Sequence, residues 1–245
     1  MKADLDINAC AELVTAHCIL VSQGVLDAFG HISLRSAEDP GQFLLPRAAP
    51  PNLVEERHIL AFGMDGEPVQ ATTAPLFSER YIHSEIYKAR PDVQAICHHH
   101  SKSIMPFVLT DRPLVAVSQT GAFLGQGMPL WDSADEFGAT RLLVDTPEQA
   151  RSLARSLGDN SVVLMRGHGA TVVGTSLHEL VFKAVYACRD ADYQRQAAVL
   201  GPLKALSAGE IAKGRVPAKP AVERAWQFWT AQLDSGANRM EGHEA

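Results

Sequence analysis

Three consecutive histidines stand in the middle of the chain, where His98, His99 and His100 follow the apolar segment VQAIC. On a β-strand, side chains two residues apart point to the same face, and their Cα atoms lie roughly 6.5–7 Å apart. The imidazoles of His98 and His100 can therefore bind one metal ion, with His99 on the opposite face. The alternative is a surface histidine cluster without a function. The internal position of the run and the apolar residues before it favour the metal site.

A fourth histidine, His168, lies between two glycines in the sequence RGHG, directly after the apolar run VVLM. Flanking glycines allow the backbone to approach another group closely. Catalytic metal sites commonly have three protein ligands and keep further positions open for substrate. His168 is therefore a candidate for the third imidazole, although a lone histidine in a turn is commonly only solvated.

Glu79 stands at the start of a segment with helical periodicity, in the sequence FSERYIHSEIYKA. Ser78 is a candidate N-cap, and His83 lies one turn after Glu79 on the same helical face. A carboxylate at this position either compensates the helix dipole or acts as a general acid or base beside the metal. The spacing alone leaves both interpretations open.

Two predicted turns at strand ends contain residues that can contact a substrate anion. The first is GHIS, with His31 and Ser33, and the second is LPRA, with Arg47. Each is a weak signal by itself, and an arginine in such a turn commonly faces solvent. Glycine-rich phosphate loops and the GxSxG sequence are absent from the chain, so nucleotide binding and serine hydrolysis lack support.

Periodicity and turn-forming residues predict the elements that position these side chains. Apolar spacing predicts an N-terminal helix that ends near Gly24. Further helices are predicted over residues 78–89, 146–158, 176–201 and 225–233. Strands are predicted over residues 29–36, 42–46, 58–63, 93–101 and 113–119, and on both sides of His168. We therefore expect one α/β domain over residues 1–206 and a C-terminal helical appendage over residues 207–245.

Composition narrows the class of protein. The 245 residues are 46% hydrophobic and 20% charged, which is enough apolar material for a packed core. The net charge of −6, without a basic stripe, argues against nucleic acid as a partner. Four scattered cysteines without framework spacing indicate reduced thiols, and no apolar run is long enough to span a membrane. These features predict a cytoplasmic protein whose partner is a small molecule.

Taken together and in this order, these segments resemble the class II aldolase/adducin family. The resemblance rests on the Gly30–Ser33 turn, the Phe77-Ser78-Glu79 helix start, the His-x-His strand and the His-Gly turn, over residues 8–201. It implies a three-layer α/β/α sandwich with a mainly antiparallel central sheet, in a homotetramer with active sites at subunit interfaces. It also implies that His98, His100 and His168 bind one divalent metal ion per subunit and that Glu79 is the catalytic acid or base.

Departures from the family pattern indicate the substrate. Sugar-phosphate aldolases of this family hold phosphate at positions that are His31, Arg47-Ala48 and Phe77-Ser78 here. Arginine pairs with carboxylates through two hydrogen bonds, and a phenyl ring can cover an aromatic face. The pattern is similar to the aromatic decarboxylase branch, which includes dihydroxyphthalate decarboxylases and the 3-hydroxy-2-methylpyridine-4,5-dicarboxylate decarboxylase of vitamin B6 degradation.

We therefore expect a metal-dependent carboxy-lyase that acts on a hydroxylated aromatic or pyridine dicarboxylate. The expected substrate-binding residues are His31, Ser33, Arg47, Phe77 and Ser78. Three imidazoles suit Zn2+, Fe2+, Co2+ and Mn2+ alike, with Mn2+ as the favoured ion. The main alternative is an aldolase that cleaves a sugar phosphate or a related hydroxy-carbonyl compound. A non-catalytic adducin-like module and an iron-dependent oxygenase are two further alternatives.

Overall fold

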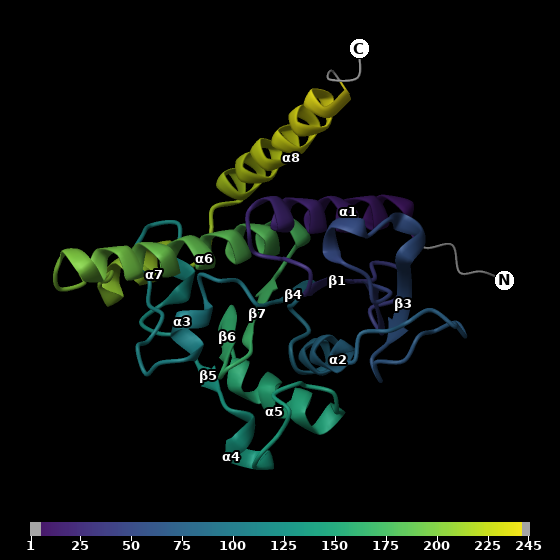
Figure 1. Ribbon diagram of the computed structural model, residues 1–245, viewed down its shortest axis with the longest axis horizontal. Helices are drawn as coiled ribbons and strands as arrows, with labels where there is room; N and C mark the ends of the chain where they lie inside the picture. Colours follow the sequence, from purple (N-terminus) through teal and green to yellow (C-terminus); the bar gives the residue numbers. More distant parts are fainter. Residues whose placement is uncertain (1–5, 242–245) are drawn as a thin grey trace.

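Helices and strands alternate irregularly along the chain in the computed structural model (Figure 1), which describes residues 6–241, with side chains to residue 235. The α-helices are α1 (Ile7–Ser22), α2 (Arg80–Ala89), α3 (Met105–Val108), α4 (Ser133–Phe137), α5 (Pro147–Leu157), α6 (Leu177–Leu200), α7 (Ala208–Gly214) and α8 (Lys219–Glu241). The strands are β1 (His31–Arg35), β2 (Gln42–Pro46), β3 (Ile59–Gly63), β4 (Ala95–His99), β5 (Leu130–Trp131), β6 (Val162–Met165) and β7 (Gly169–Gly174).

The strands form one sheet in the order β3-β2-β1-β4-β7-β6-β5. In this sheet order, every neighbouring pair from β3 across to β6 is antiparallel. The last pair differs, because β5 runs parallel to β6. The predicted mainly antiparallel sheet is therefore corrected to a mixed sheet, with its parallel pair at one edge. β4 lies in the middle of this order, so His98 and His99 at its end have strands on both sides.

Alternating strand residues divide the core into two hydrophobic clusters. Ala95 and Cys97 of β4 belong to a cluster with residues of α1 and α6, whereas Ile96 between them belongs to a cluster with residues of α2 and α5. Figure 1 shows α1 and α6 on one side of the sheet and α2 and α5 on the other. This alternation follows from the two-residue period of a strand. The three-layer description of the fold stays a prediction.

Segment 113–119 was predicted as a strand, and this prediction is wrong. Leu114 and Ala116 of this segment are buried and Val115 and Val117 are half-buried, but its backbone is outside the sheet. Side chains of α6 accept its N–H groups instead: Gln194 accepts from Val115, and buried Asp190 accepts from Val117 and Ser118. The backbone N–H groups of this segment, whose composition is typical of a strand, are therefore hydrogen-bonded without a neighbouring strand.

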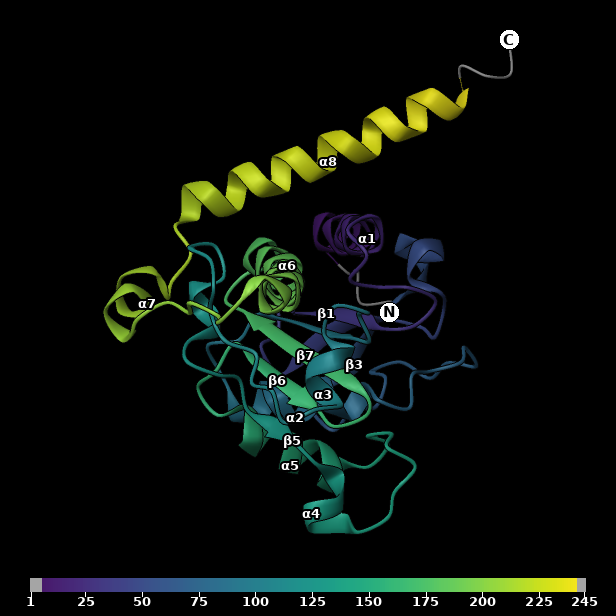
Figure 2. The same ribbon diagram turned by 60° about the vertical axis from the view of Figure 1, so that its left-hand side comes forward.

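The C-terminal helices differ in length from the prediction. Helix α8 covers residues 219–241 instead of 225–233, and α7 precedes it. Figure 2 shows α8 on the same side of the molecule as α6 and α1. Helix α8 contacts both of these helices, and Trp226 of α8 stacks on His178 of α6. Within residues 6–241, no helix combines the length and the apolar character that crossing a bilayer requires. The division of the chain at residue 206 stays a prediction.

Candidate metal centre

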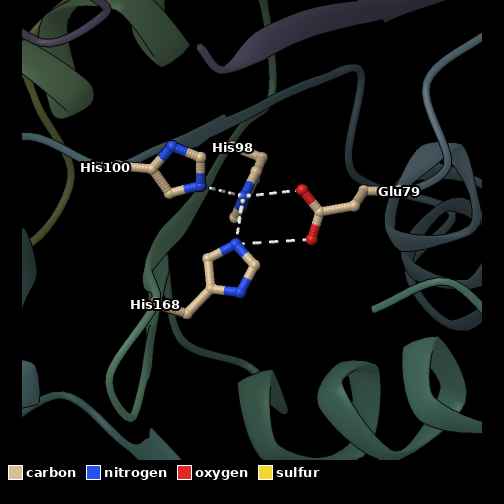
Figure 3. A group of neighbouring side chains, drawn as sticks. All are labelled: Glu79, His98, His100 and His168. Carbon is tan, nitrogen blue, oxygen red and sulfur yellow. Dashed lines mark hydrogen bonds and ion pairs between the residues drawn. The ribbon is translucent and has the colours of Figure 1, made fainter. Parts of the chain in front are cut away.

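Three histidine nitrogens and one carboxylate converge beside the end of β4. The Nε2 atom of His98 lies 3.0 Å from Nε2 of His100 and 3.1 Å from Nε2 of His168. The two carboxylate oxygens of Glu79 lie 3.5 Å from His98 Nε2 and 3.3 Å from His168 Nε2. Figure 3 shows the three imidazoles turned toward one another, with Glu79 facing them. The residues that the sequence indicated for metal binding and for acid–base chemistry thus form one cluster.

Hydrogen bonds to the outer ring nitrogens determine which inner nitrogens have free lone pairs. Nδ1 of His98 faces the Thr171 hydroxyl, which itself donates to Met165, so His98 Nδ1–H is the donor in that pair. Nδ1 of His168 donates to the carbonyl oxygen of Leu142. Both imidazoles therefore direct unprotonated Nε2 atoms at each other. Two lone pairs at 3.1 Å repel each other unless a cation lies between them.

The donor set fits a divalent transition metal. Neutral imidazoles bind such ions at about 2.0–2.1 Å, so two ligands on one ion can lie 3.0–3.1 Å apart. Burial lowers the pKa of His98 well below its usual value, and it lowers the pKa of His100 to about 4. Both imidazoles are thus held in the neutral form that binds metal. Glu79, His98, His100 and His168 together form a group that can hold an ion.

Glu79 does not cap the helix at whose start it lies. Helix α2 begins at Arg80, and not at Ser78, with Glu79 at the N-cap position but without a capping side-chain bond. The Glu79 carboxylate accepts instead from the backbone N–H of Val144 and is only 8% exposed. Burial raises the pKa of Glu79, against the lowering effect of His168 and of the Val144 bond. The carboxyl group thus retains a proton to a higher pH than an exposed glutamate does.

Two glycines allow the backbone to close around the cluster. A Cβ atom on Gly169 would lie 2.3 Å from the carbonyl oxygen of His99 and 2.8 Å from the His100 ring. A Cβ atom on Gly30 would lie 2.8 Å from the carbonyl oxygen of His98, and Gly30 has a φ of +94°. These contacts explain why a glycine follows His168 and another precedes His31. Larger residues would displace the imidazoles.

Only some of the predicted substrate-binding residues lie beside this cluster. His31 pairs with His98 across β1 and β4, and its ring lies 4.5 Å from that of Phe77. Ser78 is exposed at the start of α2. Ser33, in contrast, is fully buried, and its hydroxyl bonds to His83 and Tyr87. The prediction that Ser33 contacts the substrate is therefore wrong, because the side chain faces the interior.

The side chain of Arg47 bonds to a histidine outside the cluster. Arg47 follows β2, which is separated from β4 by β1, and its guanidinium donates to His58 Nε2. Arg47 is half-buried, so part of its side chain is open to solvent.

The structure adds residues that the sequence did not indicate. Leu142 has a φ of 62°, which is uncommon for a residue other than glycine. Its carbonyl oxygen accepts from His168, and the nearby Val144 N–H donates to Glu79. Phe29 is 68% exposed, although its ring lies edge-on to that of His100 with centroids 6.4 Å apart. Backbone groups have no sequence signal, so the role of residues 142–144 was not predictable. Phe29 directly precedes the GHIS turn in the sequence, and this position indicates that its ring lies near the cluster.

The family is established by comparison with known proteins. The Class II Aldolase and Adducin N-terminal domain matches residues 11–194, so the chain belongs to this family. Decarboxylase tropJ of Talaromyces stipitatus is 32% identical over 242 residues, covering 89% of this chain and 91% of that protein. The 3,4-dihydroxyphthalate decarboxylase of Arthrobacter keyseri is 30% identical, covering 71% of this chain and 73% of that protein. The family resemblance seen in the sequence is thus confirmed.

A solved structure supports the fold. L-fuculose 1-phosphate aldolase from Glaciozyma antarctica matches with a TM-score of 0.77 at 20% identity, covering 95% of this chain and 91% of that one. This likeness confirms the class II aldolase fold. Decarboxylases and aldolases both break carbon–carbon bonds, and their similarity to this chain identifies it as a carbon–carbon lyase.

Proposed function

We propose that the protein is a metal-dependent decarboxylase of a hydroxylated aromatic or pyridine dicarboxylate. One observation carries the proposal: a buried carboxyl group lies 3.3–3.5 Å from imidazoles suited to a divalent ion, beside a wall formed by His31 and Phe77. A flat aromatic acid can pack on such a wall. The similarity to decarboxylases over most of the chain supports the same activity.

The proposed reaction assigns Glu79 as the proton donor. When bound, a divalent ion supplies a Lewis acid for the substrate oxygen that gains negative charge. The Glu79 carboxyl transfers its proton to the ring carbon that bears the leaving carboxylate. The bond between that carbon and the carboxylate then breaks, CO2 leaves, and the electron pair of the broken bond restores the aromatic ring. Glu79 remains as a carboxylate and regains a proton from water. Its raised pKa suits this donor role.

Aromatic and cationic side chains would orient the substrate. Phe77 and the exposed Phe29 flank the cluster from α2 and from the segment before β1. His31 would hold one carboxylate oxygen. We propose that Ser78 contacts the edge of the substrate. We propose that Arg47 binds the carboxylate that is not released as CO2, through the guanidinium nitrogens that do not bond to His58. Arg47 has to turn from His58 to do so.

Several finer features belong to the same proposal. We propose one divalent ion per subunit, held by His98, His100 and His168, with Mn2+ as the favoured ion and Zn2+, Fe2+ or Co2+ as alternatives. The active form would be a cytoplasmic homotetramer with its sites at subunit interfaces. Residues 1–206 would form the catalytic domain and residues 207–245 the appendage.

A sugar-phosphate aldolase is the second candidate function. L-fuculose phosphate aldolase of Escherichia coli is 24% identical over 212 residues, and the fold matches a solved L-fuculose 1-phosphate aldolase. An oxygenase is the third, because a 4-hydroxy-3-prenylphenylpyruvate oxygenase of Streptomyces roseochromogenus is 31% identical over 96 residues.

A substrate panel tests these functions against one another. Hydroxylated pyridine and benzene dicarboxylates are assayed beside fuculose, rhamnulose and ribulose phosphates, with Mn2+, Zn2+ or Co2+ supplied. CO2 release, aldehyde formation and, with Fe2+, dioxygen uptake are measured in parallel. We expect CO2 release from aromatic acids that have a hydroxyl beside the leaving carboxylate, and much slower release from Glu79→Gln. Aldehyde formation from a sugar phosphate without CO2 release from any aromatic acid would establish the aldolase instead.

A further inference from the structure

Phe29 is an exposed aromatic residue at the open side of the candidate metal centre. Of the four clustered residues, Glu79 and His98 are buried, whereas His100 and His168 are half-buried. The cluster is therefore accessible from the side of the two half-buried histidines. The Phe29 ring lies edge-on to the His100 ring, with centroids 6.4 Å apart, and 68% of Phe29 is exposed. A molecule that contacts His100 from this side lies next to the Phe29 ring.

The backbone on both sides holds Phe29 in this place. Its N–H donates to the Asp27 carboxylate at 2.9 Å, which closes an Asx turn. Gly30 follows with a φ of +94°, and a Cβ atom there would lie 2.6 Å from the Leu26 side chain and 2.8 Å from the His98 carbonyl oxygen. The chain is thus packed directly against the end of β4 at Gly30. Phe29 is therefore placed by its backbone, and its ring remains available for a ligand.

Phe29 is also the last member of a continuous row of aromatic rings. Ring centroids are 4.5 Å apart between Phe77 and His31 and 5.3 Å apart between His31 and His98. The next distance is 4.8 Å, between His98 and His100, and Phe29 follows His100. The two phenyl rings therefore lie at the two ends of the row, with two candidate metal ligands between them.

A phenyl ring at this place offers a ligand only apolar and aromatic contacts. Aromatic rings attract one another in offset-stacked and edge-to-face arrangements, beyond the gain from the apolar area that they bury. A sugar phosphate presents hydroxyl and phosphate oxygens, which lose water beside a phenyl ring and gain no hydrogen bond from it. Phe29 thus favours a planar aromatic ligand over a polyhydroxylated one at the same cluster.

We propose that Phe29 is a specificity-determining residue, whose ring packs against the aromatic ring of a substrate bound at the cluster. This inference rests on the proposed function. It assigns the discrimination between aromatic acids and sugar-derived compounds to one side chain that neither holds the metal nor donates the proton. Replacement of Phe29 is therefore expected to change which ligand binds and to leave the bound metal in place.

The affinities of two small hydroxy acids for cobalt-loaded protein test this role. Salicylate and glycolate both have a hydroxyl near a carboxylate, and only salicylate has an aromatic ring. Isothermal titration calorimetry gives the Kd of each acid for wild type, Phe29→Ala and Phe29→Tyr. We expect wild type to prefer salicylate, and Phe29→Ala to bind salicylate about tenfold more weakly with an unchanged Kd for glycolate. Phe29→Tyr keeps an aromatic ring and should keep the preference.

Phe228→Ala is the matched control, because it removes a phenylalanine of α8 that is 58% exposed. It should bind both acids as wild type does. Elemental analysis and sedimentation compare the metal content and the assembly state of all variants. Wild type that binds salicylate no better than glycolate, or an unchanged salicylate Kd in Phe29→Ala, overturns the inference. Weaker salicylate binding together with a changed assembly state also overturns it, because Phe29 would then be a contact between subunits.

These binding measurements do not depend on turnover. Wild type that prefers salicylate but releases no CO2 from any aromatic acid contradicts the proposed function and not the role of Phe29. Wild type that releases CO2, with an unchanged salicylate Kd in Phe29→Ala, contradicts only the role of Phe29.

Discussion

His17 is expected to make the stability of the protein sensitive to acid. This histidine is fully buried in α1, where Nδ1–H donates to the Leu13 carbonyl at 2.7 Å and Nε2 accepts from the Ile32 N–H at 3.3 Å. Both ring nitrogens are in use in the neutral form. Protonation of Nε2 would break the bond to β1 and place a charge in the core. Burial accordingly lowers the pKa of His17 from 6.5 to about 4.

The sign and size of the effect follow from this shift. The unfolded chain binds a proton at His17 below about pH 6.5, whereas the folded protein binds it only near pH 4. The stabilisation is therefore complete above pH 6.5 and is lost as the pH falls from 6.5 toward 4. One pKa unit corresponds to 1.36 kcal/mol, so the full effect is about 3 kcal/mol. About 2 kcal/mol of this is lost between pH 7 and pH 5.

The assay compares wild type with His17→Gln, whose amide can donate and accept without titrating. Urea unfolding at fixed protein and metal concentration gives the difference in unfolding free energy between the two proteins at each pH. We expect this difference to shrink by about 2 kcal/mol between pH 7 and pH 5, because every other titrating group is common to both. Thr15→Val on the same helix is the control, and its curve should stay parallel to that of wild type. A His17→Gln curve that is parallel to wild type would refute the reasoning.

Three further predictions concern the candidate metal centre. His98→Ala is expected to lose the bound metal, measured by elemental analysis of the purified protein; full retention would contradict its assignment as a ligand. Glu79→Gln should bind metal normally while turnover falls by about 10²–10⁴-fold in the CO2 assay, since only the proton donor is removed; near-normal turnover would show that another group donates. Gly169→Ala should weaken metal binding in a chelator competition, because its Cβ would lie 2.3 Å from the His99 oxygen; unchanged affinity would mean that the backbone there can move freely.

The sequence was informative where side-chain type and chain periodicity act together. His98 and His100 were placed correctly because a strand brings alternate residues to one face, even though β4 itself ends at His99. The helix over residues 147–157 was predicted because Thr146 caps it, Pro147 begins it and Gly158 ends it. In each case, the local residues decide the local structure, so no knowledge of distant contacts was required.

The sequence was less informative where contacts distant along the chain decide the outcome. Residues 113–119 have the composition of a strand, but Asp190 and Gln194, about 75 residues later, bind their N–H groups. Ser33 was expected to face the substrate, and only its pairing with His83 on another element shows that it faces the core. Local pattern cannot decide between competing partners when one of them is a buried side chain from another helix.

The geometry of the candidate metal centre depends on backbone groups as much as on its four side chains. The Leu142 carbonyl sets the tautomer of His168, and the Val144 N–H fixes the Glu79 carboxylate, so one short segment orients both groups. A leucine at positive φ is costly, and this conformation directs its carbonyl to His168. Because any residue supplies a carbonyl and an N–H, no residue type in 140–145 marks this role. Candidate ligands of such a centre can be proposed from the sequence, whereas the atoms that orient them follow only from the folded backbone.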